Sequence, residues 1–91
     1  MITLPEEHPW IRLWKEEAFY HLDVREMLEN GSEPYSYIMA CLNQLEAGET
    51  LVVHALFEPL PLKVQAEKMG FQTLSSHPGT DHWTLEIANP G

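Results

Sequence analysis

Histidines are the residues of this 91-residue sequence best suited to chemistry. His54 lies in an apolar run, and His77 and His82 flank a turn-forming stretch. Neutral imidazoles bind zinc, copper, nickel or iron, and carboxylates such as Glu58 or Asp81 can complete the coordination shell. His54 with His77 or His82 is therefore a candidate transition-metal or haem-type site. The alternative for each histidine is a solvated or merely hydrogen-bonded side chain.

The sequence contains no catalytic signature. Acid-base chemistry could use His54 with Glu58 four residues later, and Asp23 with Arg25 could bind an anion. However, there is no Ser-His-Asp arrangement, phosphate-binding loop or Gly-x-Gly-x-x-Gly motif. We therefore rank an enzyme last among three hypotheses, after a binding or accessory module and a metal-binding protein.

Composition limits the partners that this chain can have. Its formal net charge is −9, from 14 acidic and 5 basic residues, so nucleic acid and anionic membranes would repel it. Cys41 is the single cysteine, which excludes an internal disulfide and a multi-cysteine metal site. No apolar run approaches the ~20 residues of a membrane span, and the N-terminus lacks the layout of a signal peptide. We expect an acidic cytoplasmic protein.

Residues 48–70 form the stretch around which the other elements can be placed. The run from Leu51 to Leu56 is apolar on both faces, which predicts an interior strand covered on both sides. The sequence at residues 58–61, Glu-Pro-Leu-Pro, favours extended backbone before each proline and lets a helix begin near Leu60 or Pro61. This helix should end at Gly70 and bury Leu62, Ala66 and Met69.

The remaining elements follow from periodicity and turn signals. The first strand is predicted at residues 19–24, and a connection with a helical turn follows at residues 26–31. Two further strands are predicted at residues 71–75 and 83–87, joined by a turn at residues 76–81. A helix should begin at Ser32 as N-cap, with Glu33 and Pro34 in its first turn. Its buried stripe should contain Tyr35, Ile38, Leu42 and Leu45. The order βαβαββ predicts an α/β two-layer sandwich, with a mixed sheet and two helices on one face.

The N-terminal residues 1–18 allow two interpretations. As a helix they would place Trp10, Leu13 and Trp14 on one face, but the same residues also alternate as a short strand. Two tryptophans so close together either pack on the domain or meet a partner. We expect this segment to cover the second face of the sheet, with a dimer contact as the other candidate. The domain itself should span residues 19–88, and residues 89–91 form a tail.

The topology predicts where a ligand would bind. The first three strands of the domain should run parallel, and ligands of open α/β sheets usually bind beyond the carboxyl ends of such strands. His77, Asp81 and His82 should lie at the same edge, whereas His8 lies outside the core and His21 within a strand. The expected ligand- or partner-binding residues at this edge are Arg25, Ser32, Glu33, His54, Glu58, Pro59 and Pro61.

Three further segments carry a family resemblance. Leu22-Asp23-Val24-Arg25, Gly48-Glu49-Thr50-Leu51 and Lys68-Met69-Gly70-Phe71, in this order of elements, resemble the TusA/SirA-like family over about residues 20–88. That resemblance implies the same fold and, in the sulfur carriers, a persulfide on the cysteine of a Cys-Pro-x-Pro motif. The motif falls on residues 31–34, where Gly31 replaces the cysteine. Cys41 lies roughly two turns further into the helix, so we do not expect sulfur relay by this mechanism.

The chain more closely resembles a cysteine-less bacterial branch of this group, a domain family of unknown function. The shared feature is an acidic-Pro-x-Pro-Leu motif at residues 58–62. This resemblance implies no particular activity. We therefore expect a small binding or accessory module with a protein partner or a second copy as its ligand. The alternatives are a transition-metal or haem-type binding protein and a sulfur-relay-related or other enzyme.

Overall fold

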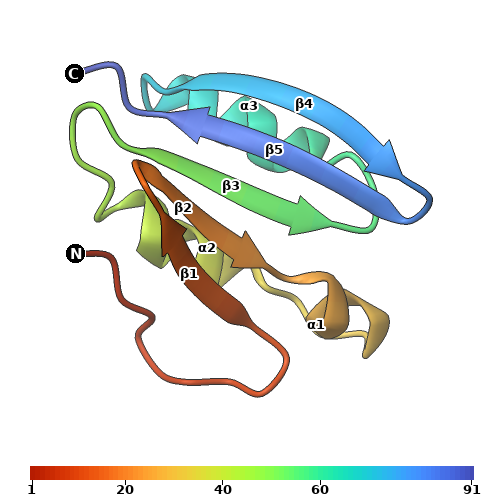
Figure 1. Cartoon of the computed structure of the whole chain (residues 1–91). Helices are drawn as coiled ribbons and strands as arrows, with labels where there is room; N and C mark the ends of the chain where they lie inside the picture. Colours follow the sequence, from red (N-terminus) through yellow and green to blue (C-terminus); the bar gives the residue numbers. More distant parts are fainter.

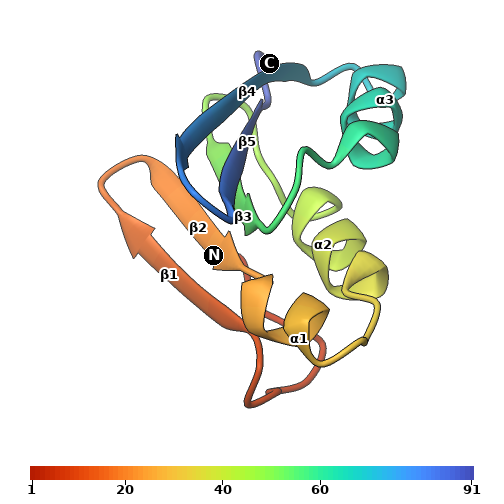
Figure 2. The same cartoon turned by 90° about the vertical axis from the view of Figure 1, so that its right-hand side faces the viewer.

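The computed structural model describes the whole chain, residues 1–91. One five-stranded sheet carries three helices on a single face (Figures 1 and 2). This arrangement confirms the predicted two-layer α/β architecture with a mixed sheet. None of the helices is long and apolar enough to span a membrane. The elements are β1 (Arg12–Glu16), β2 (Phe19–Asp23), α1 (Arg25–Glu29), α2 (Tyr35–Leu42), β3 (Thr50–Ala55), α3 (Leu60–Lys68), β4 (Gln72–Gly79) and β5 (His82–Ala88).

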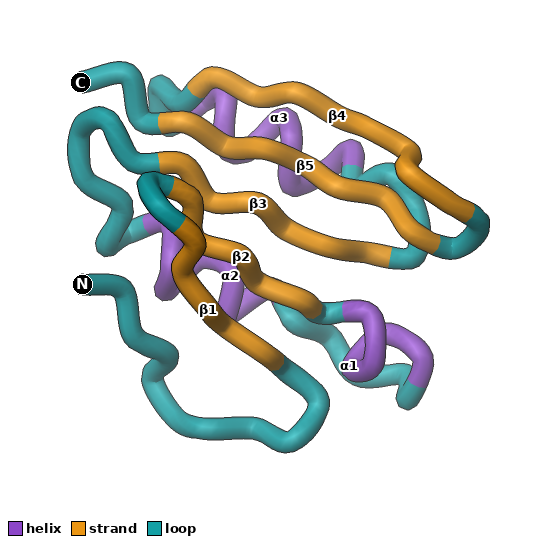
Figure 3. Tube along the Cα trace, viewed as in Figure 1, coloured by secondary structure: helices purple, strands orange, loops and turns teal.

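The strands lie in the order β1-β2-β3-β5-β4 (Figure 3). β2 and β3 pair in parallel, and β5 runs antiparallel to both β3 and β4. β4 therefore has the same direction as β3, as the sequence predicts. The last strand of the chain is inserted between them, so β3 and β4 are not neighbours.

β3 is the central strand of the sheet, with an apolar face toward the helices and Val52 between Thr50 and His54 on the other face. Leu51, Val53 and Ala55 face the helices and are fully buried, and Val52 on the opposite face is also buried. Apolar burial of this kind supplies most of the driving force for folding. The core around β3 takes in Leu22, Val24, Ile38, Cys41, Leu42, Leu62, Ala66, Leu85 and Ile87.

α3 begins at Leu60 and is followed by Gly70, which has a positive φ of 93°, as the proline and glycine signals predict. The predicted start of α2 is wrong. Its N-cap is Pro34, not Ser32, and a Glu33 side-chain oxygen accepts a hydrogen bond from the Tyr35 backbone N–H at 2.9 Å. Because Tyr35 is the first helical residue, it lies at the end of the helix and remains half-exposed instead of joining the buried stripe.

The predicted turn at residues 76–81 is also wrong in extent. β4 continues to Gly79, with an irregular register between Ser76 and Gly79, and the turn is limited to Thr80 and Asp81. Pro78 lies in the irregular part, where its missing N–H does not interrupt regular pairing. His77 consequently belongs to a strand and not to a loop.

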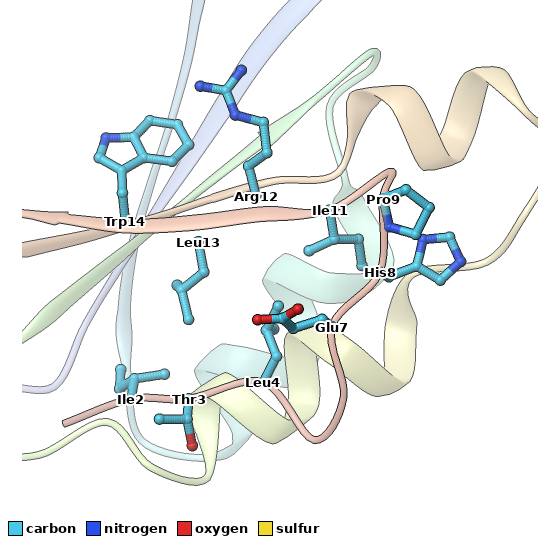
Figure 4. Close-up of a pocket in the computed structure, with 10 residues that line it drawn as sticks. All are labelled: Ile2, Thr3, Leu4, Glu7, His8, Pro9, Ile11, Arg12, Leu13 and Trp14. Atoms are coloured by element: carbon cyan, nitrogen blue, oxygen red, sulfur yellow. The ribbon is translucent and has the colours of Figure 1, made fainter.

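The N-terminal segment forms a strand, β1, that pairs antiparallel with β2. Our expectation that it covers the second sheet face is wrong, because β1 extends the sheet at its edge. Figure 4 shows Trp14 and Arg12 on one side of β1 and Ile11 and Leu13 on the other, as the period of two in a strand requires. The preceding residues return to the helix side, where the Thr3 N–H donates to the Gln44 side chain at 3.0 Å.

Candidate functional site

Three histidines lie next to one another on the face of the sheet that carries no helix. They come from the adjacent strands β2, β3 and β5. His21 Nδ1 lies 3.0 Å from His54 Nε2, and His54 Nδ1 lies 2.9 Å from His82 Nε2. Both separations are hydrogen-bond distances. We call His21, His54 and His82 the imidazole chain.

An indole covers one end of the imidazole chain. The Trp14 ring stacks on His21 with centroids 5.0 Å apart and an angle of 6° between the planes, and its centroid lies 5.6 Å from that of His54. The Trp14 Nε1–H donates to the Glu16 carboxylate at 2.8 Å. The Trp14 side chain is therefore held over His21.

His54, in the middle, is held in its neutral form. Burial lowers the pKa of His54 to about 4, and the nearby Asp23 charge offsets this effect only in part. A neutral imidazole has one N–H donor and one acceptor nitrogen. His54 therefore donates to one neighbour and accepts from the other, so both hydrogen bonds of the imidazole chain run in the same direction.

Asp23 and Arg25, the predicted anion-binding pair, bind each other. The guanidinium Nε and NH2 groups of Arg25 donate to the two oxygens of Asp23 at 3.0 and 2.8 Å. Burial alone would raise the pKa of Asp23, but the hydrogen bonds and charge of Arg25 outweigh it and lower that pKa. Both residues line an open polar cavity of about 560 Å³, together with Trp10, Arg12, Glu26, Glu29, Asn30, Leu56, Thr80 and Asp81.

A second, apolar hollow of about 160 Å³ lies on the helix side, at the carboxyl ends of β2 and β3. We call it the apolar pocket. Tyr35 and Phe57 line it and are half-exposed, and Leu60 and Val64 on the outer surface of α3 are exposed to a similar extent. The apolar pocket is lined by Val24, Leu28, Glu33, Pro34, Tyr35, Ile38, Val53, Ala55, Phe57, Pro59, Pro61 and Leu62.

The structure divides the sequence-predicted edge residues among separate places. Glu33, Pro59 and Pro61 come together in the lining of the apolar pocket, whereas Ser32 and Glu58 line neither cavity. Arg25 lines the polar cavity. His54 lies on the opposite face of the sheet from the apolar pocket, because its side chain alternates with those of Val53 and Ala55.

The predicted histidine partners separate as well. His54 and His82 are hydrogen-bonded, but the His77 ring stacks on Trp83 with centroids 4.2 Å apart and takes no part in the imidazole chain. The two predicted tryptophans have different ring partners: Trp10 lies beside His8 with centroids 5.2 Å apart, and Trp14 stacks on His21.

His21 is the site residue that sequence reasoning missed. Tyr20, Leu22 and Val24 point into the core, so the alternation of side chains along a strand requires His21 to lie on the opposite face of the sheet. This alternation was the signal from which its position could have been predicted. Strand pairing brings His21 and His82 to either side of His54, and the spacing of the three histidines in the sequence does not reveal it. The imidazoles lie in a row, and no group of three or more His, Cys, Asp or Glu side chains could hold a metal ion around one point.

Cys41, the single cysteine, is not placed to carry sulfur. It is fully buried in α2, and this burial raises the pKa of its thiol to about 11. A sulfur carrier needs an accessible thiolate. The chain therefore has no thiol suited to that role.

Comparison with known proteins matches the chain to a protein family. No curated protein and no solved structure matches the chain. The family match covers residues 21–89, from β2 through the end of β5, and leaves out the N-terminal segment with β1. Because the match spans most of the chain, this protein belongs to the family described as "Uncharacterized conserved protein (DUF2249)".

Proposed function

We propose that this protein is a small binding or accessory module of TusA-like fold, which holds an apolar side chain of a partner protein in the apolar pocket. One observation carries this proposal. Tyr35 and Phe57 line the pocket and are 46% and 53% exposed, and Leu60, between the pocket-lining Pro59 and Pro61, is 52% exposed. Contiguous exposed apolar surface around a hollow is typical of interaction sites.

α3 supports this role because it is apolar on two sides. Leu62 and Ala66 face the core and are buried, whereas Leu60 and Val64, four residues apart, share the outer surface. The outer pair adds little to the stability of the isolated domain, since its surface stays in water. A partner that covers this pair would remove apolar area from water without unfolding any element.

The walls of the pocket favour a preformed site. Pro34, Pro59 and Pro61 line it, and proline restricts the backbone on which each wall rests. Less flexibility before binding means a smaller entropy cost on binding. The volume of about 160 Å³ suits one side chain of roughly leucine or methionine size.

Charge indicates what should flank that side chain. The protein carries a net charge of −9, and Glu33 lies in the pocket lining. A partner segment with lysine or arginine beside the apolar anchor would be attracted, and an acidic one repelled. The ligand class is therefore a basic segment with one large apolar residue.

Defined peptides test this function. Nine-residue peptides with a central leucine between lysines should bind the full chain in fluorescence anisotropy, and matched peptides with glutamates should not. The double variant Phe57→Ser/Leu60→Ser should lower the affinity about tenfold or more, because it removes apolar contact area. Leu74→Ser is the control, since Leu74 is 59% exposed but lies on β4, away from the pocket.

Three results would overturn the proposal. One is no binding of any leucine peptide, and another is equal binding of lysine peptides that lack the leucine. The third is self-association of the chain that the double variant abolishes in analytical ultracentrifugation, because the pocket would then be filled by a second copy.

A further inference from the structure

β1 is an edge strand of the sheet and lines no part of the apolar pocket, so the proposed function does not use it. We propose that a second copy of this chain pairs antiparallel with β1 along its free edge, which would join two five-stranded sheets into one sheet of ten strands. Alternate residues of an edge strand turn their backbone N–H and C=O groups away from the sheet. These unpaired groups are a template for another strand.

A hollow of about 990 Å³ runs along this edge (Figure 4). Arg12 and Trp14 point to one face of β1, Ile11 and Leu13 point to the other, and all four line the hollow. A hollow lined from both faces of a strand lies at its edge and not beneath the sheet. The opposite wall is the N-terminal segment before β1, which contains no strand. The free edge therefore has space beside it for a strand.

The two edges of the sheet differ in their protection against further pairing. At the other edge, β4 has an irregular register between Ser76 and Gly79 and contains Pro78, and both features hinder the addition of a strand. β1 pairs with β2 in a regular register over all five of its residues and contains no proline. β1 is therefore the edge better suited to pairing.

The face of β1 that carries no helix presents its side chains in an ordered row. The Arg12 guanidinium carbon lies 5.4 Å from the centroid of the Trp14 ring, and Trp14 Nε1–H donates to the Glu16 carboxylate at 2.8 Å. Arg12 and Glu16 lie about 13 Å apart along the strand, too far to pair with each other. Both are exposed, and neither forms an ion pair within the chain. The row thus has a positive end, an aromatic middle and a negative end.

An antiparallel second copy reverses the order of this row. With Trp14 opposite Trp14 of the second copy, each Arg12 faces a Glu16 across the interface, so the two-fold symmetry gives two ion pairs and one aromatic pair. Shifting the register by two residues toward the turn places Lys15 opposite Lys15, and shifting it the other way places Leu13 opposite Leu13. Both shifts lose the two ion pairs. Charge therefore selects the register centred on Trp14.

The charge of β1 also differs from that of the whole molecule. The chain carries a net charge of −9, but β1 contains two of its five basic residues and one acidic residue. Repulsion between two acidic chains is therefore locally reduced at this edge. We expect a weak and reversible dimer, because pairing of two short strands buries a small area.

Sedimentation equilibrium of the full chain tests the assignment. A monomer–dimer equilibrium should be seen at ~0.5 mM, where even a Kd of about 1 mM gives a readily detected dimer fraction. Arg12→Glu and Glu16→Arg should each weaken self-association by more than about tenfold, because each places like charges opposite each other at two positions. Lys68→Glu is the matched control for Arg12→Glu, since it makes the same change of charge at an exposed residue of α3.

Mixing the two single variants gives a readout that a folding defect could not produce. In a mixed pair, each side chain at position 12 again meets an opposite charge at position 16. Arg12→Glu and Glu16→Arg should therefore form a heterodimer of about the parent affinity, although neither variant self-associates. The double variant Arg12→Glu/Glu16→Arg should likewise regain self-association.

Disulfide cross-linking tests the register. Trp14→Cys should form an intermolecular disulfide on mild oxidation, because residues directly opposite each other in an antiparallel pair have Cα atoms about 4.5–5.5 Å apart. Arg12→Cys is the matched control and should cross-link far less, since the two copies of this position would lie roughly 13 Å apart. Cys41 is buried in both variants and does not compete.

The proposal fails if the chain stays monomeric at ~0.5 mM, which would leave the edge to a strand of another protein. It also fails if the mixed variants form no heterodimer, or if Lys68→Glu weakens self-association as much as Arg12→Glu. Phe57→Ser/Leu60→Ser should leave the dimer intact, because neither residue belongs to β1. Loss of the dimer in that variant would mean that a second copy fills the apolar pocket, which contradicts this proposal and the proposed function together.

Discussion

At the scale of single residues, the Asp23–Arg25 pair links the end of β2 to the start of α1. The Asp23 side chain is only 11% exposed, and Arg25 supplies three of its hydrogen bonds, one of them from the backbone N–H. A carboxylate this far from water is stable in its charged form only while such donors remain. The guanidinium of Arg25 is therefore expected to contribute to stability and not to bind an external anion.

Arg25→Ala tests this role of the pair. At pH 7 the free energy of unfolding should fall by about 1–2 kcal/mol, because the carboxylate loses its charged partner. The pKa of Asp23 is lowered in the folded state, so this contribution is present above the ordinary aspartate pKa and disappears as the pH falls through the folded-state pKa. Urea denaturation at pH 7 and pH 3 should show the difference between variant and parent shrinking. A difference of unchanged size at pH 3 would contradict this account.

Cys41 gives a second prediction at the same scale. With its pKa raised to about 11, the thiolate fraction at pH 8 is about 100-fold below that of an ordinary thiol. Alkylation by iodoacetamide should therefore be at least 100-fold slower in the native protein than in urea. Mass spectrometry of timed samples measures both rates. Rapid native labelling would show that α2 opens far more often than its full burial implies.

At the scale of elements, the sequence predicted a strand or helix correctly where its hydrophobic period agreed with the proline and glycine residues at its ends. The apolar run at residues 51–56 predicted β3, and the two prolines with Gly70 predicted α3 to within a residue or two. The N-terminal segment was ambiguous because five residues from Trp10 to Trp14 satisfy both a helical and a strand period. Pairing with β2 decides between them, and that contact is not visible in the segment itself.

The packing of the N-terminal segment can be tested directly. Ile11 immediately precedes β1 and is buried in the core. Ile11→Ala should lower the free energy of unfolding by about 2–4 kcal/mol, because it leaves a cavity beside the helices. Leu74→Ala is the matched control and should change it by less than about 0.5 kcal/mol, since Leu74 is mostly exposed. Similar losses for both variants would show that residues 1–11 do not pack on the domain in solution.

At the scale of the whole molecule, strand order determines which polar groups meet. The direction of β4 was predictable from its helical connection, but the insertion of β5 between β3 and β4 was not. That insertion brings His82 beside His54 and moves His77 one strand further out. Three of the predicted edge residues, Glu33, Pro59 and Pro61, line the apolar pocket, because the connections before α2 and between β3 and α3 follow from local proline signals.

A single strand separates the apolar pocket from the imidazole chain. Val53 and Ala55 line the apolar pocket, and His54 between them belongs to the imidazole chain. A partner side chain anchored in the pocket would thus press on the same short piece of backbone that carries His54 on the other side of the sheet.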